Sequence, residues 1–368
     1  MLNDIIIADA TAHAYNWIPE NFAAEESQRI VAGSWAFHQG MTADRPDLRL
    51  SEQEFKQDWQ SQDISEALFF ETGIDFVSYH GTPIFDFFKD GHSATGKGFE
   101  LLARYPDRVI VYAGINPWAF ETAQEIRDEV DRLVDLGATG LKLYAARYER
   151  GATLPSRMDD EKHAFPMIER AIERGVRVIA SHKAIPIGPV NYEPYGVGDF
   201  PHACATFPEM KFEVVHSGMA FVQETAFLAS TQPNCYFNLE TSFAIQTRQP
   251  RRFAEFLGAL LRAGAADRIL YASGFSLFHP LLALQSFLDF QMPDDLVTGF
   301  GMPQVTDEVK EKILGLNYLR MHGIDPAEFR TRISGDQVSK RQAHGLEAPW
   351  SNVRARLGAG GEDANRNS

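Results

Sequence analysis

The chain has 368 residues, 44% of them hydrophobic and 23% charged, so it can bury a large core and is not intrinsically disordered. Its formal net charge of −15 argues against nucleic acid or an anionic membrane as a partner. The two cysteines, Cys204 and Cys235, have no metal-type spacing, and there is no signal-peptide pattern or apolar run of spanning length, so we expect a cytoplasmic protein.

The first predicted strand begins with the apolar residues 5–7 and becomes polar toward its end. Asp9, Thr11 and His13 follow at a period of two, which places their side chains on one face of a strand. A strand of this kind is typical of the start of a parallel α/β barrel, in which the strand ends line the active site.

Residues 17–65 contain no clear strand pattern. Ser51 and Glu54 have the spacing of a capping box, which predicts the start of a helix. A long insertion after the first strand of a barrel usually covers the mouth or forms an interface, so we expect a lid or a subunit contact here.

Helical and strand patterns then alternate regularly along the chain, and with the first strand they predict a (β/α)8 TIM barrel. An open doubly wound sheet is the alternative, but no glycine-rich phosphate loop follows any strand. The predicted helices cover residues 64–72, 96–105, 121–136, 160–174, 198–207, 220–230 and 250–264. The predicted strands cover residues 74–80, 109–113, 140–144, 176–182, 212–216, 235–240 and 269–274.

The C-terminal part changes character twice. Residues 280–324 have a helical pattern, and the sequence beyond about residue 335 becomes polar and then rich in glycine. We therefore predict a barrel over residues 1–330, including a C-terminal helical extension, and a polar tail over 331–368 that is flexible or clasps a partner.

Three histidines that end predicted strands are the strongest candidates for a site. His13, His182 and His216 come from the first, fifth and sixth strands, and Glu240 ends the seventh. Because strand ends in a barrel meet at one rim, we expect these four side chains to converge as catalytic residues. Three imidazoles with an open fourth position also make a workable zinc shell, so the three histidines are candidate metal ligands.

Further candidates for binding substrate lie near the same rim. Lys142 and Tyr144 share one face of the fourth strand, and Lys142 has the charge to pair with a carboxylate of the substrate or of the protein. Tyr15 and Trp17 follow the first strand as an apolar wall, although packing explains them equally well. His279 follows the last strand within reach of the mouth.

Several segments resemble the amidohydrolase superfamily, in its decarboxylase-like branch. Residues 181–182 resemble the strand-5 histidine of that family, and FPEMKFEVVHSG at 207–218 resembles its strand-6 segment. Residues 269–273 and 312–317 are similar to its C-terminal signature. The resemblance covers about residues 3–323 and implies a (β/α)8 enzyme that acts on a small molecule.

Two departures from the family pattern concern the metal that the resemblance implies. The strand-1 pair of the family is His-x-His or Glu-x-His, whereas this chain has Thr11-Ala12-His13. The strand-8 aspartate, which binds the metal and moves protons, is replaced by Gly274. Of the usual mononuclear ligands only His13 and His182 remain, which is too few to hold zinc well.

Three interpretations remain open. In the first, a zinc-type divalent metal is held by His13, His182 and His216, or by a carboxylated Lys142 with the latter two. In the second, the site works without metal: Lys142 binds an anion, His182 or His216 acts as acid or base, and Glu240 assists. In the third, the chain is a catalytically inactive barrel that assembles with an active paralogue.

We expect an enzyme that cleaves a C–C or C–O bond in a small carboxylated compound, aromatic or not. A decarboxylase, a retro-aldol lyase or a lactone or ring hydrolase fits better than an amidase, because the usual metal and aspartate for activating water are compromised. Barrels of this branch pair as dimers, so we also expect a homodimer or a hetero-oligomer with a paralogue.

Overall fold

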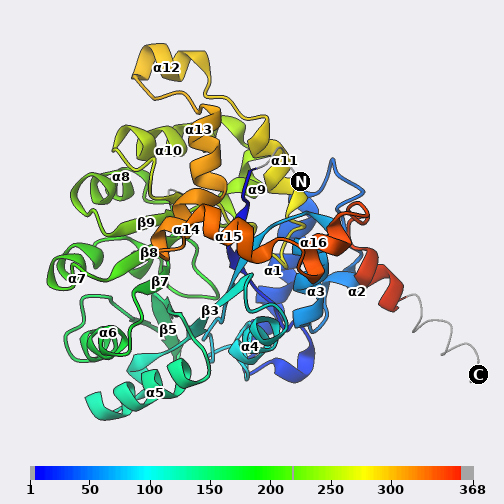
Figure 1. The fold of residues 1–368 in the computed structure, drawn as a ribbon. Helices are drawn as coiled ribbons and strands as arrows, with labels where there is room; N and C mark the ends of the chain where they lie inside the picture. Colours follow the sequence, from blue (N-terminus) through cyan, green and yellow to red (C-terminus); the bar gives the residue numbers. More distant parts are fainter. Residues whose placement is uncertain (1–4, 218, 358–368) are drawn as a thin grey trace, which may run out of the picture.

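The computed structural model describes residues 5–217 and 219–357, which form the predicted barrel of eight parallel strands (Figure 1). Each strand is hydrogen-bonded in parallel to the next one in the sheet. The strands, in sheet order, are β1 (Ala8–Ala12), β2 (Phe76–His80), β3 (Val109–Gly114), β4 (Gly140–Tyr144), β7 (Val178–His182), β8 (Lys211–Val215), β9 (Cys235–Asn238) and β10 (Ile269–Leu270).

The segment after β10 closes the barrel against β1. The backbone N–H of Ala10 donates to the carbonyl of Tyr271 at 2.9 Å, and that of His13 donates to the carbonyl of Phe275 at 2.6 Å. The carboxylate of Asp9 accepts hydrogen bonds from the backbone N–H of Ser273 at 2.9 Å and from its hydroxyl at 2.5 Å. The polar end of β1 is therefore hydrogen-bonded to the segment that follows β10, the eighth strand of the sheet.

Helices surround the barrel on its outer side (Figure 1). Helix α5 shows how the sequence sets them: Thr122 and Glu125 form a capping box, and Ile126, Val130 and Leu133 bury one apolar stripe. Among the described residues no helix is both long and apolar enough to cross a membrane. The helices that follow the strands are α4 (Thr95–Arg104), α5 (Ala123–Asp135), α6 (Ala164–Glu173), α7 (Phe200–Thr206), α8 (Val222–Thr231), α9 (Ser242–Gln246), α10 (Pro250–Arg262), α13 (Asp307–Glu311), η5 (Lys312–Leu316) and α14 (Asn317–Met321).

The insertion after β1 is helical and contributes to the C-terminal rim of the barrel. Ser51 and Glu54 form the predicted capping box, in which the hydroxyl accepts from the Glu54 N–H and the carboxylate accepts from the Ser51 N–H. A second insertion, between β4 and α6, forms an antiparallel hairpin that we did not predict. The elements concerned are η1 (Pro19–Asn21), α1 (Glu26–Met41), α2 (Glu52–Phe55), α3 (Ser61–Ser65), η2 (Glu66–Glu71), η3 (Pro117–Ala119) after β3, β5 (Ala146–Glu149), β6 (Ala152–Pro155) and η4 (Glu193–Tyr195) after β7.

The described part of the predicted tail packs on the barrel. Trp350 is 1% exposed, and its ring lies 5.6 Å from that of Trp59 and 5.9 Å from that of Phe275. The carboxylate of Glu71 accepts from the Trp350 backbone N–H at 2.7 Å. Residues 358–368 of this tail lie outside the described residues. The C-terminal helices are α11 (Leu281–Leu288), α12 (Asp294–Phe300), α15 (Pro326–Ile333) and α16 (Gln337–Gln342).

Apolar side chains fill the N-terminal end of the barrel. Phe76, Val178 and Leu270 from three strands pack there with Tyr318 from α14 and Phe329 from α15. This end is therefore closed by a core, which leaves the C-terminal ends of the strands as the open end.

Candidate active site

Four side chains from four strand ends meet at the open end of the barrel. His13 Nε2 lies 3.3 Å from Glu240 Oε1, and His216 Nε2 lies 3.6 Å from Glu240 Oε2. His182 joins them through its Nδ1, which lies 3.2 Å from His216 Nε2. All four residues are at least 96% buried. We call these residues the histidine–glutamate cluster; the predicted side chains do converge.

Backbone carbonyls fix the orientation of each imidazole in the cluster. His13 Nδ1 lies 2.8 Å from the carbonyl of His80, His182 Nε2 lies 2.5 Å from that of Ile185, and His216 Nδ1 lies 3.1 Å from that of Glu240. A carbonyl only accepts, so these ring nitrogens carry hydrogen and the other three face the cluster. The contact between His13 Nε2 and the carboxylate is attractive when this ring carries its second proton.

The electrostatic surroundings keep Glu240 ionised. Burial by itself raises the pKa of this carboxyl, but His216, His13 and Lys142 outweigh it and hold the pKa at about 2. Burial lowers the pKa of His182 well below its ordinary value and also lowers the pKa of His216. The cluster thus combines an ionised carboxylate with two imidazoles, those of His182 and His216, whose protonated forms are disfavoured by burial.

Lys142 lies beneath the cluster, inside the barrel, and not in the wall of the cavity described below. Its Nζ is fully buried and has no hydrogen-bond partner among the described residues. Burial lowers the pKa of Lys142 to about 8, against the opposing attraction of Glu240 and Glu213. Burial also raises the pKa of Glu213 to about 7. Lys142 is not among the residues that line the cavity, and its Nζ lies 6.0 Å from the centroid of the Tyr144 ring, which does line it, so a direct contact of Lys142 with a substrate stays a prediction.

The lowered pKa of Lys142 predicts a distinctive dependence of stability on pH. Between about pH 8 and the ordinary lysine value of 10.5, the unfolded chain holds this proton and the folded chain releases it. The contribution of Lys142 to the free energy of unfolding therefore rises with pH in this window. Urea unfolding of wild type and Lys142→Met at several pH values should show this rise in the difference between them. A difference that stays flat would contradict it.

A cavity of about 250 Å³ opens directly above the histidine–glutamate cluster. Among the described residues that line it, Arg29 is the only one with a fixed positive charge. Most of the remaining wall is aromatic or aliphatic, which suits a small flat compound. The wall comprises Tyr15, Trp17, Ile30, Phe37, His92, Tyr144, Ile185, Ile187 and Leu277, with Arg29 from α1.

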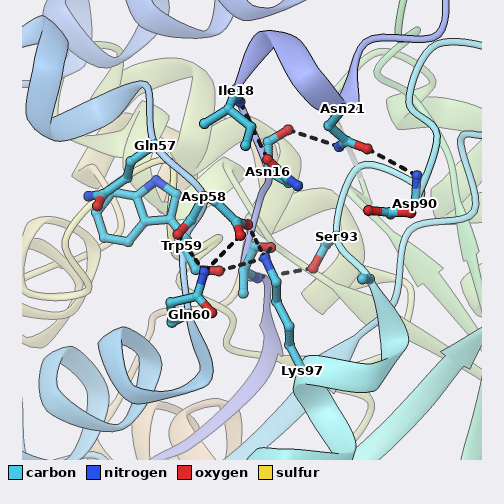
Figure 2. A network of polar contacts seen from close by, with 12 residues as sticks. Asn16, Ile18, Asn21, Gln57, Asp58, Trp59, Gln60, Asp90, Ser93 and Lys97 are labelled. Carbon is cyan, nitrogen blue, oxygen red and sulfur yellow. Dashed lines mark hydrogen bonds and ion pairs between the residues drawn. The ribbon is translucent and has the colours of Figure 1, made fainter.

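A network of polar contacts surrounds the segment after β1 (Figure 2). The hydroxyl of Ser93 accepts from the Ala14 N–H at 3.0 Å, and Asn21 Nδ2 donates to the Asn16 carbonyl at 3.1 Å. Lys97 Nζ donates to the carbonyl of Trp59 at 2.7 Å and also pairs with the carboxylate of Asp58. Tyr15 and Trp17 belong to the segment that this network surrounds, and both side chains are buried.

Ring contacts connect the wall to the cluster. The ring of Tyr144 stacks on His182 with a centroid distance of 4.3 Å, and Tyr15 lies 4.9 Å from His13. The predicted wall residues Tyr15, Trp17 and Tyr144 all line the cavity. Arg29 and His92 line it too, but sequence reasoning missed both because no periodic pattern places them relative to the strand ends.

His279, which we predicted to bind substrate, does not line this cavity. It is fully buried, and its Nε2 lies 3.0 Å from the carboxylate of Glu71. Its ring meets the edge of Trp350 at a centroid distance of 4.9 Å. This histidine therefore joins the C-terminal segment to the barrel.

Comparisons with known proteins agree with this architecture. A sequence profile described as amidohydrolase matches residues 99–324, which is more than half of the chain. The chain belongs to the amidohydrolase family. No curated protein sequence matches this amidohydrolase.

Solved structures with the same fold are similar to this amidohydrolase at low identity, so they show a shared fold only. An uncharacterised TIM-barrel protein from Bordetella bronchiseptica has a TM-score of 0.59 and 16% identity, covering 87% of this chain and 99% of its own. A 2,6-dihydroxybenzoate decarboxylase from Rhizobium has a TM-score of 0.54 and 14% identity, with coverage of 87% and 99%. A probable 2-pyrone-4,6-dicarboxylic acid hydrolase from Acinetobacter baumannii has a TM-score of 0.51 and 11% identity, with coverage of 86% and 99%.

The residues of this amidohydrolase do not fit the metal that the resemblance implied. The hydroxyl of Thr11 donates to the Ala10 carbonyl at 2.7 Å and accepts from Asn238 Nδ2 at 2.7 Å, so it is engaged inside the barrel. Gly274 offers no side chain. Among the residues that the structure describes, no group of three or more His, Cys, Asp or Glu is arranged to hold a metal ion.

This arrangement also does not support the predicted shared ligation by His13, His182 and His216. His182 faces His216 directly, and Glu240 lies between the other pair of rings. A shell built on a carboxylated Lys142 finds no support either, since among the described residues no group of His, Cys, Asp or Glu is arranged to share a metal with it, and its buried Nζ has no hydrogen-bond partner there. We therefore assign no step to a metal.

Proposed function

We propose that this amidohydrolase cleaves a C–C or C–O bond in a small ring compound that carries a carboxylate. One observation carries the proposal: an ionised, buried Glu240 lies between two imidazoles at the floor of an aromatic-walled cavity. Burial of a carboxylate costs stability unless it is paired, and a buried carboxylate with a strongly shifted pKa at the floor of a cavity is a candidate for catalysis.

The cavity wall suggests how such a substrate binds. A flat ring fits against Tyr15 and Tyr144, whose own rings already stack on the histidines beneath. The guanidinium of Arg29, on α1, lies at the wall of the cavity, and its ion pair among the described residues is a 4.0 Å contact to Glu26. It is therefore available to pair with a substrate carboxylate.

Acid–base chemistry by the cluster accounts for the bond cleavage. In a decarboxylation, the bond between a ring carbon and its carboxyl carbon breaks and CO₂ leaves. The electron pair that remains on the ring carbon takes a proton, which we assign to Nε2 of protonated His13, 3.3 Å from Glu240 Oε1. In a lactone, water attacks the ring carbonyl carbon and gives a proton to His13 Nε2; the ring C–O bond then breaks, and this proton passes to the departing oxygen, so that a hydroxy acid forms. Both reactions use Glu240 to stabilise a charged imidazole.

The names of the structural neighbours support the same class of compound. The Rhizobium protein is a decarboxylase of a dihydroxybenzoate, and the Acinetobacter protein is a probable hydrolase of a pyrone dicarboxylate. Both compounds are small rings with carboxylates, and the two reactions break a C–C and a C–O bond respectively.

A substrate panel tests this proposal. Purified protein is mixed with hydroxybenzoates and other ring carboxylates, with 2-pyrone-4,6-dicarboxylate, and with neutral methyl esters of the same compounds as matched controls. We expect CO₂ release or loss of ring absorbance for at least one acid, and none for its ester. Absence of both turnover and measurable binding across the acids would contradict the proposal and favour an inactive barrel that assembles with a paralogue.

A further inference from the structure

The carboxylate of Glu240 lies beside the position that a side chain at residue 274 would occupy. A Cβ atom on Gly274 would lie 3.4 Å from Glu240 Cγ and 3.5 Å from its Oε1. Gly274 also has a φ of +70°, in the left-handed region that favours glycine. An aspartate at this position would therefore begin against Glu240 and on a strained backbone.

The residues around Glu240 are built to hold it in this place. Asn238 Oδ1 accepts from the Glu240 backbone N–H at 2.8 Å, and Asn238 Nδ2 donates to Glu213 Oε1 at 2.5 Å and to the Thr11 hydroxyl at 2.7 Å. Thr11 thus supports the strand that carries Glu240. The two positions that depart from the family pattern are therefore both near Glu240, which follows β9. Thr11 is hydrogen-bonded to Asn238, and Gly274 leaves space beside the carboxylate.

A buried ammonium group is already present near this carboxylate. The Lys142 ammonium is fully buried, and Glu240 and Glu213 are the charges that act on it. A divalent cation between the histidines would lie close to this ammonium in a medium that screens charge weakly, so the two would repel each other strongly.

We propose that this amidohydrolase has exchanged the metal of its family for charges of its own, with Glu240 as the carboxylate and Lys142 as the cation, and that its cavity does not bind a divalent metal. This goes beyond the proposed function, because it concerns cation binding and holds whichever substrate the enzyme takes. Turnover of the substrate panel and metal binding can therefore succeed or fail separately.

Elemental analysis and calorimetry test the inference. The protein is expressed with added zinc, manganese and iron and purified without chelator. We expect less than about a tenth of an equivalent of any transition metal, and no saturable binding when zinc is titrated into the protein. Where activity on the panel is found, we expect it to be unchanged after dialysis against a chelator.

Two further measurements show whether any bound metal belongs to the cavity or to another part of the molecule. If metal is present, anomalous X-ray scattering locates it: a peak within bonding distance of the histidine–glutamate cluster overturns the inference, and a peak elsewhere on the molecule supports it. In solution, metal content that falls when Glu240→Gln or His13→Asn is introduced also overturns it, whereas content that these variants leave unchanged belongs to another site.

Discussion

Replacing Glu240 with glutamine is expected to lower turnover by about 10²- to 10⁴-fold, the usual range for losing a group that acts in proton transfer. Glutamine keeps the size of the side chain but removes the charge that His13 and His216 face at 3.3 and 3.6 Å. The protonated imidazole then loses its counter-charge inside a buried site. The measurement is kcat on the substrate found in the panel, with thermal unfolding to show that the variant is folded.

Glu224→Gln is the matched control for this experiment. Glu224 lies on α8, is exposed, and does not line the cavity, so the same chemical change there should leave kcat unaltered. A folded Glu240→Gln protein with the wild-type kcat would remove Glu240 from the proposed machinery.

Replacing Asp199 with asparagine is expected to destabilise the protein by about 3–5 kcal/mol, the typical cost of breaking a buried ion pair on one side. Lys183 Nζ lies 2.8 and 2.9 Å from the two oxygens of Asp199, and the side chains are only 1% and 4% exposed. Without the carboxylate the ammonium stays buried and uncompensated. Urea unfolding at neutral pH measures the loss.

This ion pair also joins the end of β7 to the segment that shapes one wall of the cavity. Asp199 Oδ2 accepts from the Met158 N–H at 2.9 Å, and the Ala184 N–H donates to the Tyr195 carbonyl at 2.9 Å. Asp159→Asn is the control, because the pair of Asp159 with Arg157 lies at the surface and should contribute less than about 1 kcal/mol. Equal losses in the two variants would contradict the importance of burial.

The convergence of the cluster could be predicted because it depends on simple rules. His13, His182, His216 and Glu240 each follow an apolar run of strand length, and parallel strands in a barrel bring their carboxyl ends to one rim. Local pattern and barrel topology together are therefore enough to assemble these four residues. The strands that meet can be far apart along the chain: the hydrogen bond between Thr11 and Asn238 joins residues separated by 227 positions.

Depth within the barrel could not be predicted with the same ease. Lys142 and Tyr144 share a face of β4, but Lys142 lies two residues before the strand end and thus one layer deeper, below the cavity. Tyr144, the last residue of the strand, reaches the wall. A period of two identifies the inward face, whereas the level at which the cavity floor lies is set by side chains from other strands.

Contacts made by loops and by the C-terminal segment could not be predicted from the sequence, for a different reason. His279 contacts Glu71 and Trp350. The hydrogen bond from the Trp350 backbone N–H to the Glu71 carboxylate joins two residues that are separated by 279 positions in the sequence. Irregular segments have no period that sets direction, so the sequence did not indicate that this histidine packs against the tail. Arg29 reaches the cavity from an insertion helix for the same reason.

The most direct test of the central claim is a crystal structure with a ring carboxylate that the enzyme binds. We predict that the ring lies between Tyr15 and Tyr144, with its reacting atom within hydrogen-bond reach of His13 Nε2 and its carboxylate toward Arg29. A ligand bound with full occupancy at another place, with the space above His13 and Glu240 empty, would contradict the account.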